Sequence, residues 1–433
     1  MAIREVIAKK RDGSELSPEE IRETVDGYVL GRVADSQMAA LLMAIVLRGM
    51  TARETADLTF AMVASGESLD LSSVPGTKVD KHSTGGVGDK TTLVVAPLVA
   101  SLGVPVPKMS GRALGHTGGT IDKLECIPGL TAALSPDRFR RQVAEIGVAI
   151  AAQTDEMAPA DKKIYALRDT TATVESVPLI ASSVMSKKLA AGADAIVLDV
   201  KAGAGAFMPD VESARELAEA MVDIALRGEK RVVALVTRMD EPLGAAVGDG
   251  PELIEAVQTL AGHGPPDFVE LCEIVAGHML HLGGAARDPE QGRERARHGL
   301  ASGVGLAKLR EMVAAQGGRA DVVDRPEALI GGAERIPVEA ERDGYVAAID
   351  ARCIGALVRD LKTRTGERKS ECGVLLHRKT GDPVGGGRLA SVLVPREMRD
   401  PGMQAAADVR RAFEIAERAP ERPHILAAVV APH

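Results

Sequence analysis

Two glycine-rich loops that carry hydroxyl side chains lie within the segment from Lys78 to Glu125. The first runs over residues 83–88 (STGGVG) and the second over residues 116–120, from His116 to Thr120 (HTGGT). Such loops present backbone N–H groups and hydroxyls to an anion, and a helix N-terminus adds a favourable dipole. The segment holds six Lys or Arg against four Asp or Glu, in a chain of net charge -8. This local excess of positive charge predicts a phosphate site.

The same segment lacks the standard nucleotide-binding motifs. In GGVGDKTT, Asp89 precedes Lys90, whereas a P-loop places its lysine directly after glycine. A dinucleotide-binding GxGxxG also fails, because Thr91 stands where the third glycine belongs. The loops are therefore not those of an NTPase or of a dinucleotide-binding enzyme.

The elements that position these loops begin with a helical unit. Ser17, Asp35 and Thr51 each precede an apolar helical pattern, and the first and last have a capping-box Glu three residues later. Residues 1–66 are therefore expected to form a helical domain. Residues 158–192 also show a helical pattern, and we expect them to join this domain.

An α/β domain is predicted over residues 78–155 and 193–330. Short apolar runs there, TTLVVAPLVA (91–100), AIVLDV and RVVALVT, read as strands and alternate with helical patterns. This alternation predicts a mainly parallel sheet with helices on its faces.

Residues 331–433 change character again. GYVAAID, GVLLHR and RLASVLVP, with Gly-Asp-Pro turns, predict a small C-terminal α+β module that is closed by a helix near residues 408–419. The expected fold class is therefore all-α plus α/β, with a small helical domain, a large α/β domain and this module.

Composition excludes several classes of protein. The chain has 433 residues, 61 Asp plus Glu against 53 Lys plus Arg, no Trp and three Tyr, which argues against a nucleic-acid binder. Its longest apolar stretch is broken by Pro97 and is shorter than the ~18 residues of a membrane span, and the first residues lack a signal-peptide pattern. Four cysteines without CxxC pairing argue against disulfides and structural zinc. We expect a cytoplasmic protein that binds neither nucleic acid nor membrane.

Residues 110–125, SGRALGHTGGTIDKLE, resemble the signature of the thymidine and pyrimidine-nucleoside phosphorylases. The segments KHSTGGVGD, ALRDTTATVES and SSVMSKKLAAGADAIVLDVKAGAGAFM resemble others of that family. The resemblance implies a homodimer with its active site between a helical and an α/β domain. It also implies reversible phosphorolysis of pyrimidine nucleosides, uridine or thymidine, to the base and (deoxy)ribose 1-phosphate, with inorganic phosphate as co-substrate and no organic cofactor.

Carried over by position, the resemblance implies two sets of site residues. The phosphate ligands would be Lys81, Ser83, Thr92, Ser110 and Thr120. The base contacts would be His82, Arg168, Ser183 and Lys187, with His82, Arg168 and Lys187 as the catalytic residues. Ser183 and Lys187 are four residues apart and share one helix face. A guanidinium fork, an ammonium and a hydroxyl suit the polar edge of a pyrimidine.

The resemblance further implies a monovalent cation, K⁺, near the first loop. Its ligands would be the carbonyls of Gly88, Leu243 and Ala246 and the carboxylate of Glu255. Position 90 carries Lys where some relatives carry Thr, and an ammonium resembles K⁺ in charge and roughly in size. Two hypotheses stay open: the Lys90 ammonium replaces the ion, or Lys90 points to solvent.

Two other functions stay open. One is a phosphoribosyltransferase acting on an aromatic acid such as anthranilate, which would need Mg²⁺ and a pyrophosphate site, although SGRALGHTGGT argues against it. The other is a non-catalytic nucleoside-binding protein. That function predicts the loss of at least one of Lys81, His82, Arg168 and Lys187, and all are present.

Overall fold

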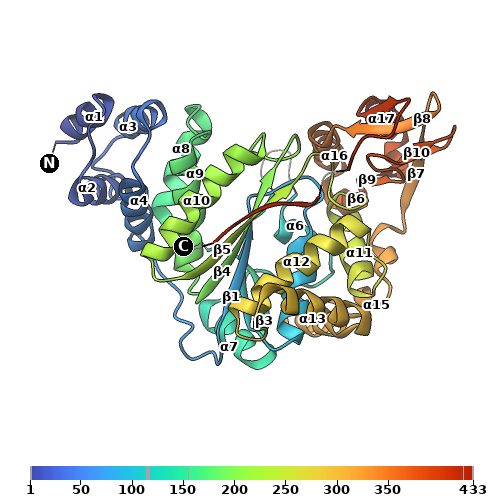
Figure 1. Ribbon diagram of the computed structural model, residues 1–433, viewed down its shortest axis with the longest axis horizontal. Helices are drawn as coiled ribbons and strands as arrows, with labels where there is room; N and C mark the ends of the chain where they lie inside the picture. The colour runs from blue at the N-terminus through green and yellow to red at the C-terminus, as the bar shows by residue number, and fades with distance from the viewer. Residues whose placement is uncertain (1, 114–117, 155, 423, 432–433) are drawn as a thin grey trace.

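The computed structural model describes residues 2–113, 118–154, 156–422 and 424–431. A helical unit formed by the start of the chain lies at one end of the molecule, and a strand-rich module lies at the other (Figure 1). Between them stands a parallel sheet that is covered by helices.

The helical unit combines the first helices of the chain with two later ones. Its helices are α1 (Ile3–Arg11), α2 (Pro18–Val29), α3 (Asp35–Arg48), α4 (Ala52–Ala64), α8 (Pro159–Thr170) and α9 (Val177–Ala190). Ile164 of α8 and Leu179 of α9 share one buried core with Val6, Ile21 and Leu41. The capping boxes predicted at the starts of α2 and α4 are confirmed.

The central sheet has the order β1-β4-β5-β13. Its strands are β1 (Val79–Ser83), β4 (Ala195–Ala202), β5 (Arg231–Arg238) and β13 (Leu426–Val430), and the first three are parallel. A separate parallel pair joins β2 (Val106–Ser110) to β3 (Val148–Ala152). Every residue of β4 is buried, as expected for a parallel strand with helices on both faces.

Helices α7 (Pro136–Ile146), α10 (Val211–Arg227), α11 (Asp249–Leu260), α12 (Pro266–Leu282), α13 (Pro289–Ser302) and α14 (Val304–Ala315) cover the α/β region. Shorter elements there are α6 (Thr120–Leu124), β6 (Ala246–Val247), α15 (Asp321–Asp324) and the 3₁₀ helix η1 (Pro326–Ile330). Across the described residues, each helix is too short or too polar to cross a bilayer.

The strand predicted over residues 91–100 is wrong. These residues form α5 (Thr91–Ser101), a helix whose first ten residues are all buried. A helix that is apolar on every side has no 3.6-residue pattern, so its sequence cannot be told from that of a buried strand.

The C-terminal module differs from the expectation in two ways. Its elements are β7 (Ala333–Glu339), β8 (Gly344–Ile349), α16 (Ala351–Thr365), η2 (Gly366–Glu371), β9 (Gly373–Leu376), β10 (Pro383–Val384), β11 (Arg388–Pro395), η3 (Arg396–Met398), α17 (Arg399–Arg411) and β12 (Phe413–Ala416). The helix expected near 408–419 ends at Arg411, because residues 413–416 pair with β8 instead. The boundary 331–433 is also too wide, since β13 leaves the module and covers the edge of β5.

The buried Glu54 carboxylate holds the helical unit together near its first loop. Both of its oxygens accept from the Lys10 ammonium at 2.9 Å, and they also accept the backbone N–H groups of Leu16 (2.8 Å) and Thr51 (2.9 Å). Glu54→Ala leaves the Lys10 ammonium buried without its counter-ion. We expect the free energy of unfolding, measured by urea titration, to fall by about 3 kcal/mol or more.

Arg53→Ala is the matched control. Arg53 lies beside Glu54 in the sequence but forms half-exposed ion pairs with Glu15 and Asp57 and one hydrogen bond to the Leu16 carbonyl at 2.7 Å, so its loss should cost only about 1 kcal/mol. Equal losses in the two variants would contradict the assigned role of Glu54.

Candidate active site

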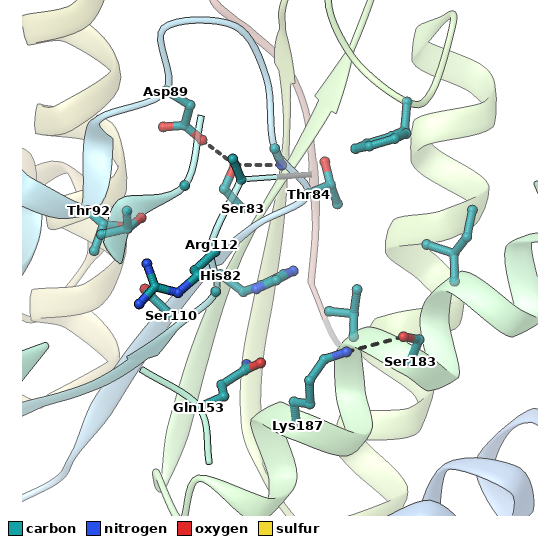
Figure 2. A pocket seen from close by; sticks show the side chains of 18 of the residues that line it. His82, Ser83, Thr84, Asp89, Thr92, Ser110, Arg112, Gln153, Ser183 and Lys187 are labelled. Carbon is teal, nitrogen blue, oxygen red and sulfur yellow. Dashed lines mark hydrogen bonds between the residues drawn. The ribbon is translucent and has the colours of Figure 1, made fainter. Parts of the chain in front are cut away.

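A cavity of about 370 Å³ lies between α8 and α9 of the helical unit and the carboxyl ends of β1 and β2 (Figure 2). Its lining includes these predicted site residues: His82, Ser83, Thr92, Ser110, Thr120, Arg168, Ser183 and Lys187. Residues 114–117 of the second glycine-rich loop, with His116 and Thr117, lie outside the described residues.

Four hydroxyl side chains expected to bind phosphate line this cavity. Ser83 ends β1 and Ser110 ends β2, so both stand at the carboxyl ends of parallel strands. Thr92 lies in the first turn of α5, and Thr120 is the first residue of α6. Strand ends and helix N-termini of this kind bring hydroxyls and N–H groups together around an anion.

Lys81 is the expected phosphate ligand that does not line the cavity. Its side chain is buried, with the ammonium 3.2 Å from Asp199 and 4.0 Å from Asp89. Burial alone would lower the pKa of Lys81, but these two carboxylates outweigh burial and raise it. Lys81 is therefore a charged lysine that lies outside the cavity lining.

A buried network extends from Lys81 into the sheet. The Asp199 carboxylate pairs with Lys201 at 2.8 Å and accepts the Thr237 hydroxyl at 2.6 Å. The backbone N–H of Lys201 donates to the Thr84 hydroxyl at 2.9 Å. These contacts join β4 and β5 to the loop that follows β1, beside the lining residues Ser83 and Thr84.

His82 lies among positive side chains. Burial lowers the pKa of His82 well below its ordinary value of 6.5, and the nearby Lys188 and Lys108 lower it further. Asp80, two residues earlier on β1, pairs with Lys188 (2.8 Å) and Lys108 (3.4 Å). The imidazole is therefore neutral at neutral pH.

Lys108 lines the cavity and was missed by the sequence analysis. Its amino group donates to the Met109 carbonyl at 2.9 Å. Burial, together with Lys188, outweighs the attraction of Asp80 and lowers the pKa of Lys108 well below its ordinary value. A lysine inside an apolar strand that ends at a predicted phosphate loop was the available signal.

One face of α9 forms the helical side of the cavity. Ile180, Ser183, Val184 and Lys187 all line it and follow the spacing of one helix face. The Lys187 ammonium lies 2.5 Å from a carboxylate oxygen of Asp161 on α8 and 3.3 Å from the Ser183 hydroxyl. The expected pair of a hydroxyl and an ammonium is therefore present, with a carboxylate behind it.

Arg168 lines the cavity but is 1% exposed, because its guanidinium is bound by backbone. It donates to the carbonyls of Thr173 (3.0 Å), Val174 (2.6 Å) and Leu179 (3.0 Å). These bonds use three of the five N–H groups of a guanidinium. Arg168 therefore also fixes the connection between α8 and α9.

Other residues complete the lining, and most of them lie in the segments that resemble the phosphorylase family. Val174, Phe207, Met208 and Leu217 add apolar wall, and Gln153, directly after β3, adds a carboxamide. Asp89 and Arg112 also line the cavity, and Arg112 forms a bidentate pair with Glu125.

Lys90 does not point to solvent, so that hypothesis is wrong. Its ammonium lies 2.6 Å from the Leu243 carbonyl, 3.1 Å from the Ala246 carbonyl and 2.5 Å from the Glu255 carboxylate. The ring of Phe268 lies beneath it, with the centroid at 5.0 Å. The ammonium thus takes up three of the oxygen groups expected to hold a cation.

Gly88, the fourth expected cation ligand, contacts the backbone of Lys90 and not its ammonium. Its carbonyl accepts the backbone N–H of Lys90 at 3.1 Å. Its φ is 76°, and a Cβ atom there would lie 2.7 Å from the Leu243 carbonyl oxygen, so the loop needs glycine at this close approach.

Known proteins resemble the chain over most of its length. A model described as "Glycosyl transferase family, a/b domain" matches residues 75–306, and one described as "Glycosyl transferase family, helical bundle domain" matches residues 4–66. A pyrimidine-nucleoside phosphorylase from Geobacillus stearothermophilus is 50% identical over 92% of this chain and 94% of its own length. A protein of the same name from Bacillus subtilis is 47% identical over 98% of this chain and 99% of its own.

A solved structure shares the fold at lower sequence identity. The anthranilate phosphoribosyltransferase from Thermus thermophilus matches with a TM-score of 0.59 and 23% identity, over 72% of this chain and 98% of that one. This likeness concerns the fold alone.

His82 provides a prediction about protonation. We expect its imidazole to stay neutral from pH 8 down to pH 6 because burial and the surrounding lysines oppose a further positive charge. Histidine NMR signals, assigned with His82→Gln, would show no titration near 6.5. The pKa of His82 is lower in the folded state than in the unfolded chain, so below about pH 6.5 the unfolded chain binds a proton that the folded state does not. The free energy of unfolding should therefore decrease as the pH falls below about 6.5. A midpoint at or above 6.5 for His82 would refute the neutral state.

Proposed function

The chain belongs to the pyrimidine-nucleoside phosphorylase family, with the helical-bundle and a/b domains of glycosyl transferases, and on this premise we propose that it catalyses reversible phosphorolysis of pyrimidine nucleosides. The products are the free base and (deoxy)ribose 1-phosphate. One observation carries the proposal. A single cavity has hydroxyls suited to phosphate on its α/β side, and Ser183 and Lys187 on its helical side.

We propose that phosphate binds among the hydroxyls of Ser83, Thr92, Ser110 and Thr120. A phosphate oxygen attacks C1′ while the glycosidic bond breaks, through a state with oxocarbenium character. The bonding electrons leave with the base, so negative charge develops on its ring and O2. The Lys187 ammonium stabilises that charge, which makes the interaction stronger in the transition state than in the bound nucleoside.

His82 and Arg168 complete the proposed base site. A neutral imidazole offers one N–H donor, so His82 is proposed to hydrogen-bond the leaving base without adding charge. Arg168 contributes a fixed positive charge and the donors that its backbone bonds leave over. Ser183, beside Lys187, adds a hydroxyl for the polar edge of the ring.

The two competing functions are less well supported. The phosphoribosyltransferase shares the fold at 23% identity, whereas the phosphorylases are 47–50% identical over nearly the full chain. A binding protein without activity has no need for the complete set of His82, Arg168 and Lys187, and all three line one cavity.

We also propose that the enzyme is a cytoplasmic homodimer that acts on uridine and thymidine. The helical unit exposes Leu30, Met43 and Leu47, the last to 73%, and Met43 and Leu47 are one turn apart on α3. Exposed apolar side chains of this size support contact with a second copy. The described cysteines are free, which supports a reducing compartment.

The activity is tested by phosphate-dependent release of uracil from uridine and of thymine from thymidine. Lys187→Gln should lower kcat/KM by about 100-fold or more, because it removes the ammonium that faces the developing charge and keeps a donor for Asp161. Lys163→Met on α8 is the control: it also removes a lysine charge from the helical unit but lies outside the cavity lining, so its rate should match wild type. Absence of base release from both nucleosides would refute the function.

We propose that Lys90 takes the place of a bound K⁺. Its ammonium lies within hydrogen-bond distance of the carbonyls and carboxylate that would hold the ion. Wild-type kcat/KM should therefore be equal in buffers whose only monovalent cation is K⁺ or tetramethylammonium. Lys90→Thr empties the cage and should lose activity unless K⁺ is added. A wild-type enzyme that loses activity without K⁺ and regains it with K⁺ would contradict the replacement.

A further inference from the structure

A carboxylate lines the cavity among the groups proposed to hold phosphate. Asp89 lies in the loop between β1 and α5, and its side chain is 8% exposed. One of its oxygens accepts the Ser83 hydroxyl at 2.5 Å, and the other accepts the backbone N–H of Thr91 at 3.1 Å. Figure 2 shows Asp89 and Ser83 joined in this way, near Thr92. A carboxylate is an unexpected neighbour for an anion, so its role needs an explanation.

Asp89 is ionised at neutral pH. Burial alone would raise its pKa, but the ammonium groups of Lys81, Lys201 and Lys123 and the Ser83 hydroxyl hold the pKa well below its ordinary value. An ionised carboxylate can only accept hydrogen bonds. Asp89 therefore presents acceptors alone.

Ser83 is turned into an acceptor by this contact. A serine hydroxyl has one proton, and that of Ser83 is donated to Asp89. The Gly85 N–H donates to the same Ser83 oxygen at 3.2 Å. Toward a ligand, the Ser83 oxygen can therefore only accept a hydrogen bond. Asp89 and Ser83 together form a pair of acceptors, whereas the hydroxyls of Thr92, Ser110 and Thr120 can each donate.

The cations near this end of the cavity do not override that pattern. The Lys81 ammonium does not line the cavity. Arg112 does line it, but its guanidinium is held by Glu125 at 2.6 and 2.7 Å and by Asp122 at 3.2 Å. Lys108 also lines it, but its amino group donates to the Met109 carbonyl at 2.9 Å and lies 3.4 Å from Asp80. Hydrogen-bond donors and acceptors therefore decide which oxyanion fits.

We propose that Asp89 and Ser83 select an oxyanion that still carries a proton at neutral pH, such as hydrogen phosphate or hydrogen arsenate, over sulfate. The inference rests on the proposed phosphorolysis and specifies which anions the site takes. A P–OH or As–OH group donates to the acceptor pair. Sulfate has no proton near pH 7, so its oxygens would face the lone pairs of Asp89 and Ser83. A site built to hydrogen-bond a ligand hydroxyl rejects an analogue that lacks the hydroxyl by about 10⁴-fold. The reason is that the analogue leaves buried polar groups of the protein without a hydrogen-bond partner.

The test compares anions in the uridine phosphorolysis assay at pH 7. Wild type should use arsenate in place of phosphate, while the inhibition constant of sulfate should exceed the KM for phosphate by about 100-fold or more. Asp89→Asn replaces an acceptor oxygen by an NH₂ donor. In this variant the ratio of the sulfate inhibition constant to the KM for phosphate should fall at least about 10-fold. Thermal-shift titrations with phosphate and with sulfate should show the same change in relative affinity, and they do not depend on turnover.

Asp199→Asn is the matched control. It removes the same charge beside Lys81 but lies outside the cavity lining, so it should change phosphate and sulfate affinity by one common factor and keep their ratio. A wild-type ratio below about 10 would overturn the inference even if Asp89→Asn does not fold. So would an unchanged ratio in a folded Asp89→Asn variant. Absence of any phosphate-dependent base release would instead refute the proposed function, so the two failures are distinguishable.

Discussion

The structure depends on pairing the lysines that are buried around the cavity with carboxylates. Asp80 pairs with Lys108 and Lys188, Asp199 pairs with Lys81 and Lys201, and Asp89 lies 4.0 Å from Lys81, so three carboxylates face four amino groups. A buried charge without a partner is strongly destabilising, and partners must therefore be held in fixed positions. The incomplete match also explains why the pKa of Lys108 falls: burial and the nearby Lys188 outweigh the one carboxylate that it shares.

This requirement also connects the two halves of the site. Lys188 comes from α9 of the helical unit, and its carboxylate partner Asp80 lies on β1 of the sheet. The adjacent Lys187 lines the cavity and pairs with Asp161 of α8. One helix thus anchors itself to the sheet with one lysine and presents the next to the ligand. Arg168 fixes the connection that precedes α9, so the base side is held from both ends.

The sequence predicted the parts of the fold that depend on interactions between residues close together in the chain. The caps at Ser17 and Thr51 place the starts of helices because their hydroxyls bond N–H groups three residues away. The apolar helix at residues 91–100 was assigned as strand, since its burial on all sides comes from the layers around it. The last strand, β13, pairs with β5 almost 200 residues earlier, and its partner follows from tertiary packing alone.

The candidate site also has features that local sequence predicts and features that depend on tertiary packing. Ser183 and Lys187 share a face because of their spacing, so sequence could place them together. Asp161, the partner of Lys187, is distant in sequence, and no motif links the two. Glu255 was expected near Lys90 through the family resemblance alone. The Lys81 side chain was expected at the cavity surface, but the carboxylates of Asp89 and Asp199 hold it below that surface. Ligand types were therefore readable, whereas the depth at which each charge lies was not.

The depth at which each charged side chain is buried affects the proposed catalysis. The buried Lys81 and Lys201 lie behind the cavity lining, whereas the side chains of Lys108, Arg112 and Lys187 line the cavity itself. Phosphorolysis consumes negative charge at the attacking oxygen and creates it on the departing base. A direct ammonium at the phosphate would stabilise the nucleophile most before attack, which lowers the bound state more than the transition state. An ammonium at the base acts mainly when charge arrives there. In the proposed mechanism the Lys187 ammonium therefore lies where the reaction generates charge, and the buried Lys81 and Lys201 attract phosphate from behind the lining without weakening it as a nucleophile.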